Sequence, residues 1–224
     1  MKSTFFAIDL DRCLIKSDVL IDIFMHVLDD LDIISFDTIS AIQKEVELTG
    51  KSFQILIYLR DNGYIDEASQ AKVSALFCER ALARRSEHVA EDADELFAYL
   101  HENNIHHAII SFGGHGWQEL KLQASGLDVV PHQIVSHPRK SDELRSWMTD
   151  DGFLLPRIFD GVSVDDIVLI DDKAVAFDNL PPHVRGYWMQ IKGGELLPSQ
   201  QGTVPDSVQI VYDFKSIIEK EKSL

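Results

Sequence analysis

Acidic residues follow two apolar runs of the sequence, and their type and spacing suit phosphoryl chemistry. Asp9 and Asp11 come after the run at 5–8, and Asp171 and Asp172 come after the run at 166–170. If the two runs are neighbouring strands, four carboxylates converge, and like charges that close need a cation to stay ionised. Oxygen ligands without His or Cys favour Mg²⁺, which commonly takes further ligands from a phosphate. The four acids therefore predict a Mg²⁺ site with an anionic ligand.

The pair Asp9 and Asp11 suits covalent phosphoryl transfer. One carboxylate can attack phosphorus while the other, two residues further along the chain, handles a proton. Aspartate is an established acceptor of phosphoryl groups in covalent catalysis. The pair therefore predicts a nucleophile and an acid–base partner at the end of one strand.

Two other segments offer groups that bind phosphate. Ser111, Phe112 and Gly113 provide a hydroxyl and backbone N–H groups that lead into a helix beginning near His115, and such helix starts bind anions. Lys140 suits a point charge that holds the phosphate and a nucleophilic Asp together. A second lysine, Lys121, is a competing candidate for this role.

Alternating strand-like and helix-like segments must position these residues. Short apolar runs occur at 5–8, 107–111, 133–135 and 166–170, and further strands are expected at 184–191 and 208–211. Helices are expected at 92–102 and 214–222. This alternation predicts an α/β fold with a doubly wound, mostly parallel sheet. In such sheets ligands bind beyond the carboxyl ends of the strands, where the acids and Ser111 lie.

The interval between the first two strands is too long for one strand–helix–strand unit. Asp9 and Ser111 are about 100 positions apart, whereas such a unit needs about 30 residues. Apolar residues at helical spacing fill the interval, for example Leu20, Phe24 and Val27, with breaks at 49–50 and 62–63. We therefore predict an all-helical domain at 17–88 and an α/β core domain at 1–16 and 89–224.

Four motifs in this order resemble those of the haloacid dehalogenase superfamily. Residues 6–14, with Asp9 and Asp11, resemble its first motif, and the strand ending in Ser111 resembles the second. Lys140 matches the third motif, and the strand ending in Asp171 and Asp172 matches the fourth. The helical segment after the first motif corresponds to the family's usual helical cap, and the resemblance spans nearly the whole chain.

The resemblance implies a role for each motif residue. Asp9 would be the nucleophile and a Mg²⁺ ligand, and Asp11 would exchange protons and offer its carbonyl oxygen to the ion. Ser111 and Lys140 would bind phosphoryl oxygens, with Asp172 as the main fourth-motif ligand and Asp171 supporting it. Because Asp11 is present, the resemblance favours a phosphatase over a dehalogenase, with the cap acting as a lid that selects the substrate.

Three positions depart from the family pattern and leave a second function open. Cys13 replaces the usual Thr or Val of the first motif. Asp172 is followed by Lys173 and, four residues on, by Ala176, where many members have a further acid. A weakly active or inactive binding or regulatory protein is therefore the alternative to a phosphatase. A phosphomutase is also compatible with these motifs. A phospho-receiver domain is disfavoured, because it has no long helical insertion.

Composition narrows the class of partner. The 224 residues carry 37 Asp and Glu against 21 Lys and Arg, a net charge of −16, which disfavours nucleic acid as a partner. Acidic residues interrupt the apolar stretch at 19–34, so we expect no membrane span. Two cysteines, Cys13 and Cys78, without zinc-ligand spacing favour a reducing setting. We therefore expect a cytoplasmic protein that acts on a small phosphorylated metabolite.

Overall fold

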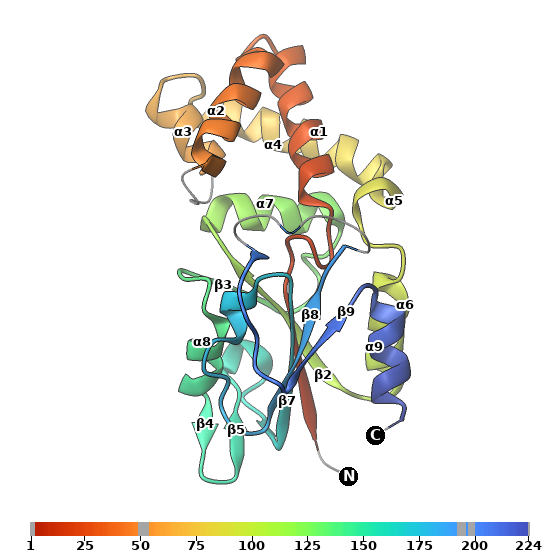
Figure 1. Cartoon of the computed structure of the whole chain (residues 1–224). Coiled ribbons are helices and arrows are strands. Elements are labelled where there is room, and N and C mark those ends of the chain that lie inside the picture. Colours follow the sequence, from red (N-terminus) through yellow and green to blue (C-terminus); the bar gives the residue numbers. More distant parts are fainter. Residues whose placement is uncertain (1–2, 49–53, 192–195, 197–199, 224) are drawn as a thin grey trace. The chain divides into compact units, whose positions relative to one another are not determined.

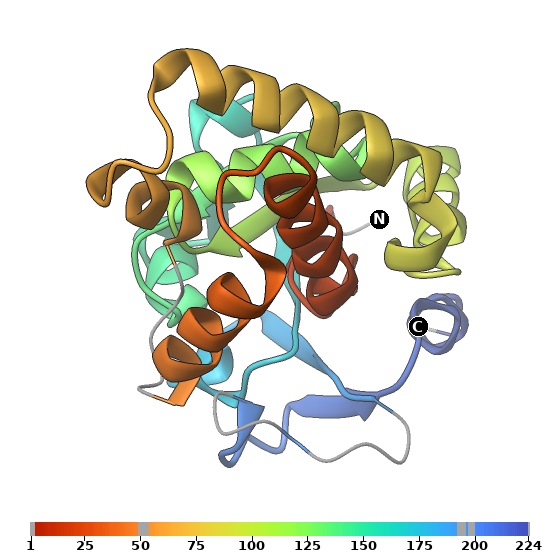
Figure 2. The same cartoon turned by 90° about the horizontal axis from the view of Figure 1, so that it is seen from above.

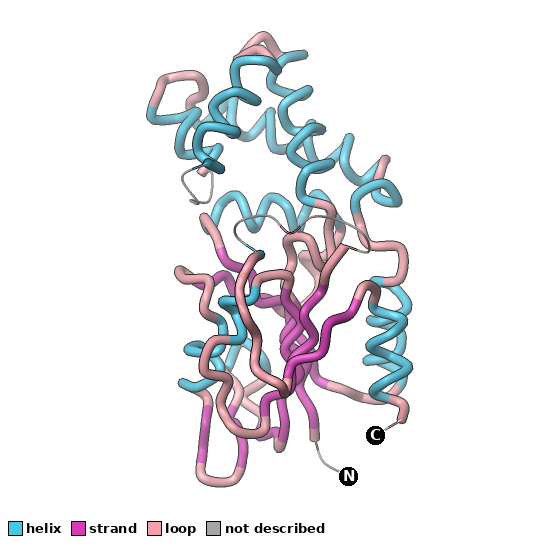
Figure 3. The backbone as a smooth tube through the Cα atoms, viewed as in Figure 1, coloured by secondary structure: helices cyan, strands magenta, loops and turns pink. Residues whose placement is uncertain are grey.

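A six-stranded parallel sheet forms the centre of one part of the chain (Figure 1). The computed structural model describes residues 3–48, 54–191, 196 and 200–223. The sheet has the spatial order β3-β2-β1-β7-β8-β9, and every neighbouring pair is parallel. Figure 3 shows the strands in magenta. Its strands are β1 (Thr4–Ile8), β2 (His106–Phe112), β3 (His132–Val135), β7 (Asp166–Asp171), β8 (Val184–Met189) and β9 (Val208–Val211). All six predicted strands are confirmed.

Helices lie on both faces of this sheet, as expected for a doubly wound fold. The helices α6 (Ala93–Glu102) and α9 (Phe214–Glu221) pack against each other on one face (Figure 1). On the other face lie α8 (Lys140–Ser146) and a small antiparallel sheet that the sequence did not predict. Its strands are β4 (Met148–Thr149), β5 (Gly152–Leu154) and β6 (Ser163–Val164). The 3₁₀ turn η1 (Arg157–Phe159) lies between β5 and β6, and η2 (Ala174–Phe177) comes after β7.

Apolar side chains on both faces of β1 explain why the strand has no polar alternation. Residues 5–8 are fully buried, because β1 pairs on both edges and is covered on both faces. On one face Phe5 packs against Trp147 and Phe159, at ring-centroid distances of 6.0 and 5.5 Å. The ring centroids of Trp147 and Phe159 are themselves 5.8 Å apart. The three aromatic rings therefore pack together between the small antiparallel sheet and the main sheet.

The strands β1 and β7 flank the point in the sheet at which the order of strand addition reverses. From β1 the chain adds β2 and β3 on one side, and β7, β8 and β9 then extend the sheet on the other side. The ends of β1 and β7 are level, because the Asp9 N–H donates to the Ile170 carbonyl oxygen at 2.8 Å. Such a reversal point is where open α/β sheets bind ligands, and both acidic pairs follow the strands that flank it.

Helices form a second compact unit, which comprises Ile15–Val89 and Gly113–Val129. Phe24 of α1, Phe77 of α4 and Trp117 of α7 form its aromatic centre, with ring-centroid distances between 4.9 and 5.8 Å. Seen from above, the long α4 runs beside α7 (Figure 2). The helices are α1 (Ser17–Asp30), α2 (Phe36–Leu48), α3 (Ile55–Asp61), α4 (Glu67–Ala83), α5 (Arg85–His88) and α7 (His115–Ser125).

The insertion after β1 is helical, as predicted, and local signals set its helix boundaries. The chain leaves α3 around Asn62 and Gly63, and α4 then begins with a capping box between Asp66 and Ser69. The predicted break at 49–50 lies outside the described residues. Among the described helices, none has both the length and the apolar character needed to cross a bilayer.

The helix α7 packs with the helices of the second unit and therefore belongs to that unit rather than to the α/β unit. The α/β unit comprises Met1–Leu14, Ala90–Phe112 and Val130–Leu224. The sequence had placed the whole of 89–224 in the α/β core, because α7 follows a core strand and precedes another. Packing of Trp117 on Phe24 and Phe77 accounts for the difference. The domain boundaries at 16–17 and 88–89 stay a prediction.

Candidate active site

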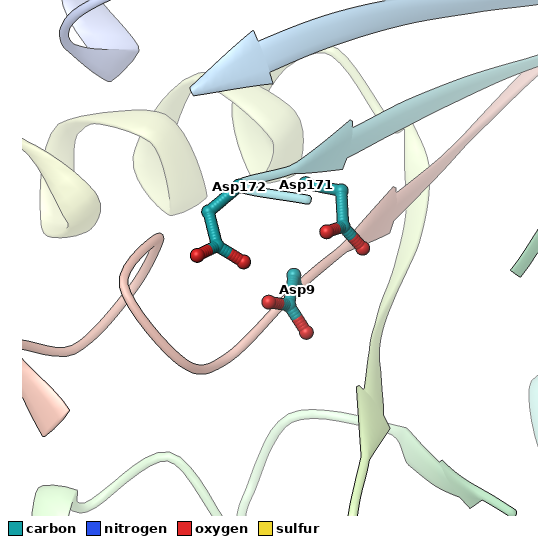
Figure 4. Close-up of side chains that lie close together, drawn as sticks. All are labelled: Asp9, Asp171 and Asp172. Carbon is teal, nitrogen blue, oxygen red and sulfur yellow. The ribbon is translucent and has the colours of Figure 1, made fainter. Parts of the chain in front are cut away.

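Three aspartates meet at the carboxyl ends of β1 and β7. Asp9 follows β1, Asp171 is the last residue of β7, and Asp172 comes directly after it. One carboxylate oxygen from each lies within 4.8 Å of one oxygen of the other two, and all three residues are buried (Figure 4). The predicted convergence of acids that are far apart in the chain is therefore confirmed for these three.

Lys140 lies among these acids. Its Nζ donates to Asp171 Oδ2 at 2.5 Å and also to Asp9 Oδ1, and only 2% of the side chain is exposed. Lys140 is the first residue of α8, on the same α/β unit. The competing Lys121 lies on α7 in the helical unit, with its Nζ 5.8 Å from the centroid of the Trp117 ring. The structure thus brings Lys140 to the acidic cluster.

Hydrogen bonds distinguish the two fourth-motif acids. Both oxygens of Asp171 have internal donors, since the Lys173 N–H reaches Oδ1 at 2.8 Å and Lys140 reaches Oδ2. Asp172 Oδ2 accepts from Gln200 Nε2 at 2.8 Å, whereas its buried Oδ1 has no partner among the described residues. Gln200 is itself buried. Sequence reasoning missed Gln200, because nothing in the pattern around position 200 links it to a strand end 28 residues earlier.

Burial and crowding change the acidity of the cluster. Burial raises the pKa of Asp9 to about 6, against the opposing effect of Lys140. Burial, reinforced by the charges of Asp9 and Asp171, raises the pKa of Asp172 to about 8. The pKa of Lys140 is raised, because the two carboxylates that it binds outweigh the cost of burying its charge. Near neutral pH the cluster without a cation therefore retains protons that a cation would displace.

The cluster fits a hard divalent cation. Asp172 Oδ1 is buried without a donor, and no described residue donates to Asp9 Oδ2. Two oxygens are thus left available in a group that contains only oxygen donors, and hard cations such as Mg²⁺ prefer oxygen. A buried carboxylate oxygen without a partner is costly, and a bound cation would compensate that cost.

The remaining predicted residues are not among the three clustered aspartates. Ser111 lies in β2, next to β1, and its buried Oγ has no hydrogen-bond partner among the described residues. Phe112 is the last residue of β2. Gly113 begins the stretch that belongs to the helical unit. Asp11 is half-buried and lies outside the group of three acids. The roles assigned to these four residues stay predictions.

Lys173 is a second residue that sequence reasoning did not place in the site. It follows Asp172, and its Nζ lies 5.4 Å from the centroid of the Phe112 ring. Burial lowers the pKa of its ammonium, but the charges of the four predicted acids outweigh burial and raise the pKa overall. The signal that could have found Lys173 was its position directly after Asp171 and Asp172.

Comparison with known proteins identifies the fold. No family model and no curated protein matches the chain. A haloacid dehalogenase-like hydrolase from Burkholderia xenovorans has a similar structure, with a TM-score of 0.64, 16% identity and coverage of 100% of this chain and 98% of that one. A haloacid dehalogenase-type hydrolase from Bacillus subtilis bound to magnesium scores 0.52 at 13% identity, with coverage of 98% and 99%. A hydrolase from Pseudomonas syringae scores 0.50 at 17% identity, with coverage of 100% and 99%.

These similarities cover nearly all of both chains in each pair. At identities of 13–17% they establish a shared fold. The chain therefore has the haloacid dehalogenase-like α/β fold that its motifs predict. What it catalyses must be argued from its own side chains, because one fold supports many functions.

Proposed function

We propose that this protein is a Mg²⁺-dependent phosphatase that hydrolyses a small phosphomonoester through an aspartyl-phosphate. The observation that carries the proposal is the buried group of Asp9, Asp171 and Asp172, whose ligand atoms lie within 4.8 Å of one another beside Lys140. The proteins of similar fold are hydrolases, and the one from Bacillus subtilis has bound magnesium, which is consistent with this chemistry.

The residues that would hold the ion are Asp9 and Asp172, the latter through its buried Oδ1 that lacks a donor, with Asp171 fixed beside them. The predicted carbonyl ligand from Asp11 belongs to the same proposal. When bound, the ion would supply positive charge to the phosphoryl oxygens, where negative charge is spread in phosphoryl transfer.

Asp9 is the proposed nucleophile. Lys140 binds Oδ1, which leaves Oδ2 to attack phosphorus in line with the ester oxygen. A bond forms between Oδ2 and phosphorus, and the bond from phosphorus to the ester oxygen breaks. Asp11 donates its proton to that oxygen, so the leaving group departs as an alcohol.

Water then completes the reaction. Asp11, now ionised, accepts a proton from a water molecule as the water oxygen attacks phosphorus. The bond between phosphorus and Asp9 Oδ2 breaks, which releases inorganic phosphate and restores the carboxylate. Ser111 donates its buried Oγ–H to a phosphoryl oxygen in this scheme, which would satisfy a hydroxyl that otherwise lacks a partner.

The test combines a panel of small phosphomonoesters with a matched pair of variants. We expect the unaltered chain to release phosphate from at least one ester when Mg²⁺ is present, and D9N to release none. D178N is the control, because Asp178 is half-buried, lies outside the acidic cluster and pairs with Arg139. Circular dichroism checks that D9N remains folded.

Three outcomes contradict the proposal. Turnover by D9N at the rate of the unaltered chain would exclude Asp9 as the nucleophile. Retained Mg²⁺ binding with no hydrolysis of any ester would favour the binding or regulatory protein that Cys13 and Lys173 left open. Transfer of the phosphoryl group to a second sugar hydroxyl, rather than to water, would identify a phosphomutase.

A further inference from the structure

The candidate site contains two lysines, and only one of them is bound to acids. Lys140 Nζ contacts two buried carboxylates, Asp9 and Asp171, so two of its three N–H groups are engaged. Lys173 Nζ forms no ion pair within 4.0 Å with any acid in the described part of the chain. It makes a cation–π contact with the Phe112 ring. Lys173 therefore has N–H groups available for a ligand, although the acids are close by.

The strand order locates the Lys173 side chain. Lys173 follows the end of β7, and Phe112 is the end of β2, while β1 lies between these two strands. Adjacent strands are about 4.8 Å apart, so the ends of β7 and β2 are about 10 Å apart. Because Lys173 Nζ lies 5.4 Å from the centroid of the Phe112 ring, the two side chains together span the end of β1. That end carries Asp9.

An ammonium in this position lies beside any group that Asp9 attacks. Its apolar stem and its charge are supported by the Phe112 ring, which orients the side chain but accepts no conventional hydrogen bond. A phosphoryl group at Asp9 would bring oxygen acceptors to the same place, next to Ser111 in the adjacent strand.

We propose that Lys173 is a second ligand-binding cation of this site, beside Lys140, and donates to the oxygens of a phosphoryl group held at Asp9. The inference rests on the proposed function for the identity of the ligand. It adds a residue outside the four motifs to those that bind the phosphoryl group. Neutralising Lys173 should therefore weaken ligand binding without weakening the metal site.

Inorganic phosphate is a suitable probe, because it is the product of the proposed reaction. We would measure its affinity by isothermal titration calorimetry on the full chain with Mg²⁺ present, for the unaltered protein and for K173M, K173R and K222M. Methionine keeps an unbranched apolar stem on Phe112 and removes the charge. Lys222 is the matched control, since its Nζ lies 5.5 Å from the Tyr99 ring in the same unit.

We expect K173M to bind phosphate about 10- to 100-fold more weakly, the range for losing a hydrogen bond between charged groups. K173R should recover part of the affinity, because it restores the charge, and K222M should bind as the unaltered chain does. Mg²⁺ affinity of K173M, measured without phosphate, should be equal or higher, because a positive charge near the ion has been removed. In hydrolysis assays K173M should raise KM more than it lowers kcat.

Phosphate binding by K173M at the affinity of the unaltered chain would overturn the inference. So would an equal loss in K222M, weaker Mg²⁺ binding by K173M, or no phosphate binding by the unaltered chain. Loss of phosphate binding in K173M, together with no hydrolysis by the unaltered chain, would support this inference and overturn the proposed function. The two proposals therefore fail in different ways.

Discussion

Removing the charge of Lys140 should destabilise the protein strongly and in a way that depends on pH and Mg²⁺. Lys140, 2% exposed, binds Asp9 and Asp171, which are equally buried. The substitution K140M keeps an unbranched side chain and leaves two buried carboxylates without their counter-ion. Breaking a buried ion pair from one side costs about 3–5 kcal/mol, a large part of the 5–15 kcal/mol that stabilises a typical domain.

The dependence on conditions follows from the same charges. At pH 5 the variant can protonate Asp9, whose pKa is already raised to about 6 when Lys140 is present, so the loss should be smaller than at pH 7.5. Mg²⁺ should also reduce the loss at pH 7.5, because a bound cation replaces the missing positive charge. Urea unfolding with EDTA, and then with Mg²⁺, measures each of these differences.

K121M is the comparison variant. Lys121 is also buried, but it lies on α7 over the Trp117 ring. Its removal should change the free energy of unfolding by an amount that does not depend on Mg²⁺. A loss below about 1 kcal/mol for K140M at pH 7.5 without Mg²⁺ would refute the reasoning, because an uncompensated buried charge must cost more than an exposed one. An Mg²⁺-dependent loss in K121M would refute it as well.

Three further predictions concern titration and hydrogen bonding. Since folding raises the pKa of Asp9 to about 6 and of Asp172 to about 8, these groups destabilise the metal-free protein as pH rises from about 4 to 8, and the increase in Tm caused by Mg²⁺ should grow over that range; a constant increase would contradict this. Q200A should lower Mg²⁺ affinity about 10- to 100-fold in calorimetry, whereas Q201A, which changes an exposed neighbour, should not; equal affinities would exclude Gln200 as a support for Asp172. Burial lowers the pKa of His88, so its contribution to stability is complete above pH 6.5 and is lost as pH falls through its folded pKa; H88Q should show a flatter dependence of unfolding free energy on pH below 6.5, and an unchanged slope would contradict the assignment.

The strands of the main sheet were predictable, because their side chains are buried on both faces. Uninterrupted apolar runs such as 5–8 and 166–170 are typical of central parallel strands, and β1 and β7 formed there. The strands β4, β5 and β6 have two or three residues each, which is too short for any periodic signal. The packing of Phe5 on Trp147 and Phe159 organises that region instead, through contacts between residues far apart in the chain.

The helical insertion was predictable from length, but the grouping of α7 was not. A strand–helix–strand unit has a typical size, so the excess of residues before β2 pointed to a separate helical segment. The sequence around 115–125 is compatible with a helix on either unit. Contacts of Trp117 with Phe24 and Phe77 decided that it packs with the inserted helices.

In the candidate site, the apolar runs before Asp9, Asp171 and Asp172 were enough to place these acids at strand ends, which meet at one edge of a parallel sheet. That β1 and β7 are neighbours is known only from the fold, as are the contacts that Lys140, Gln200 and Lys173 make in this region. A buried strand can be recognised from the sequence because burial on both faces requires a local run of apolar residues. The position of a long polar side chain depends instead on partners that are distant in the sequence and come within reach only in the folded chain.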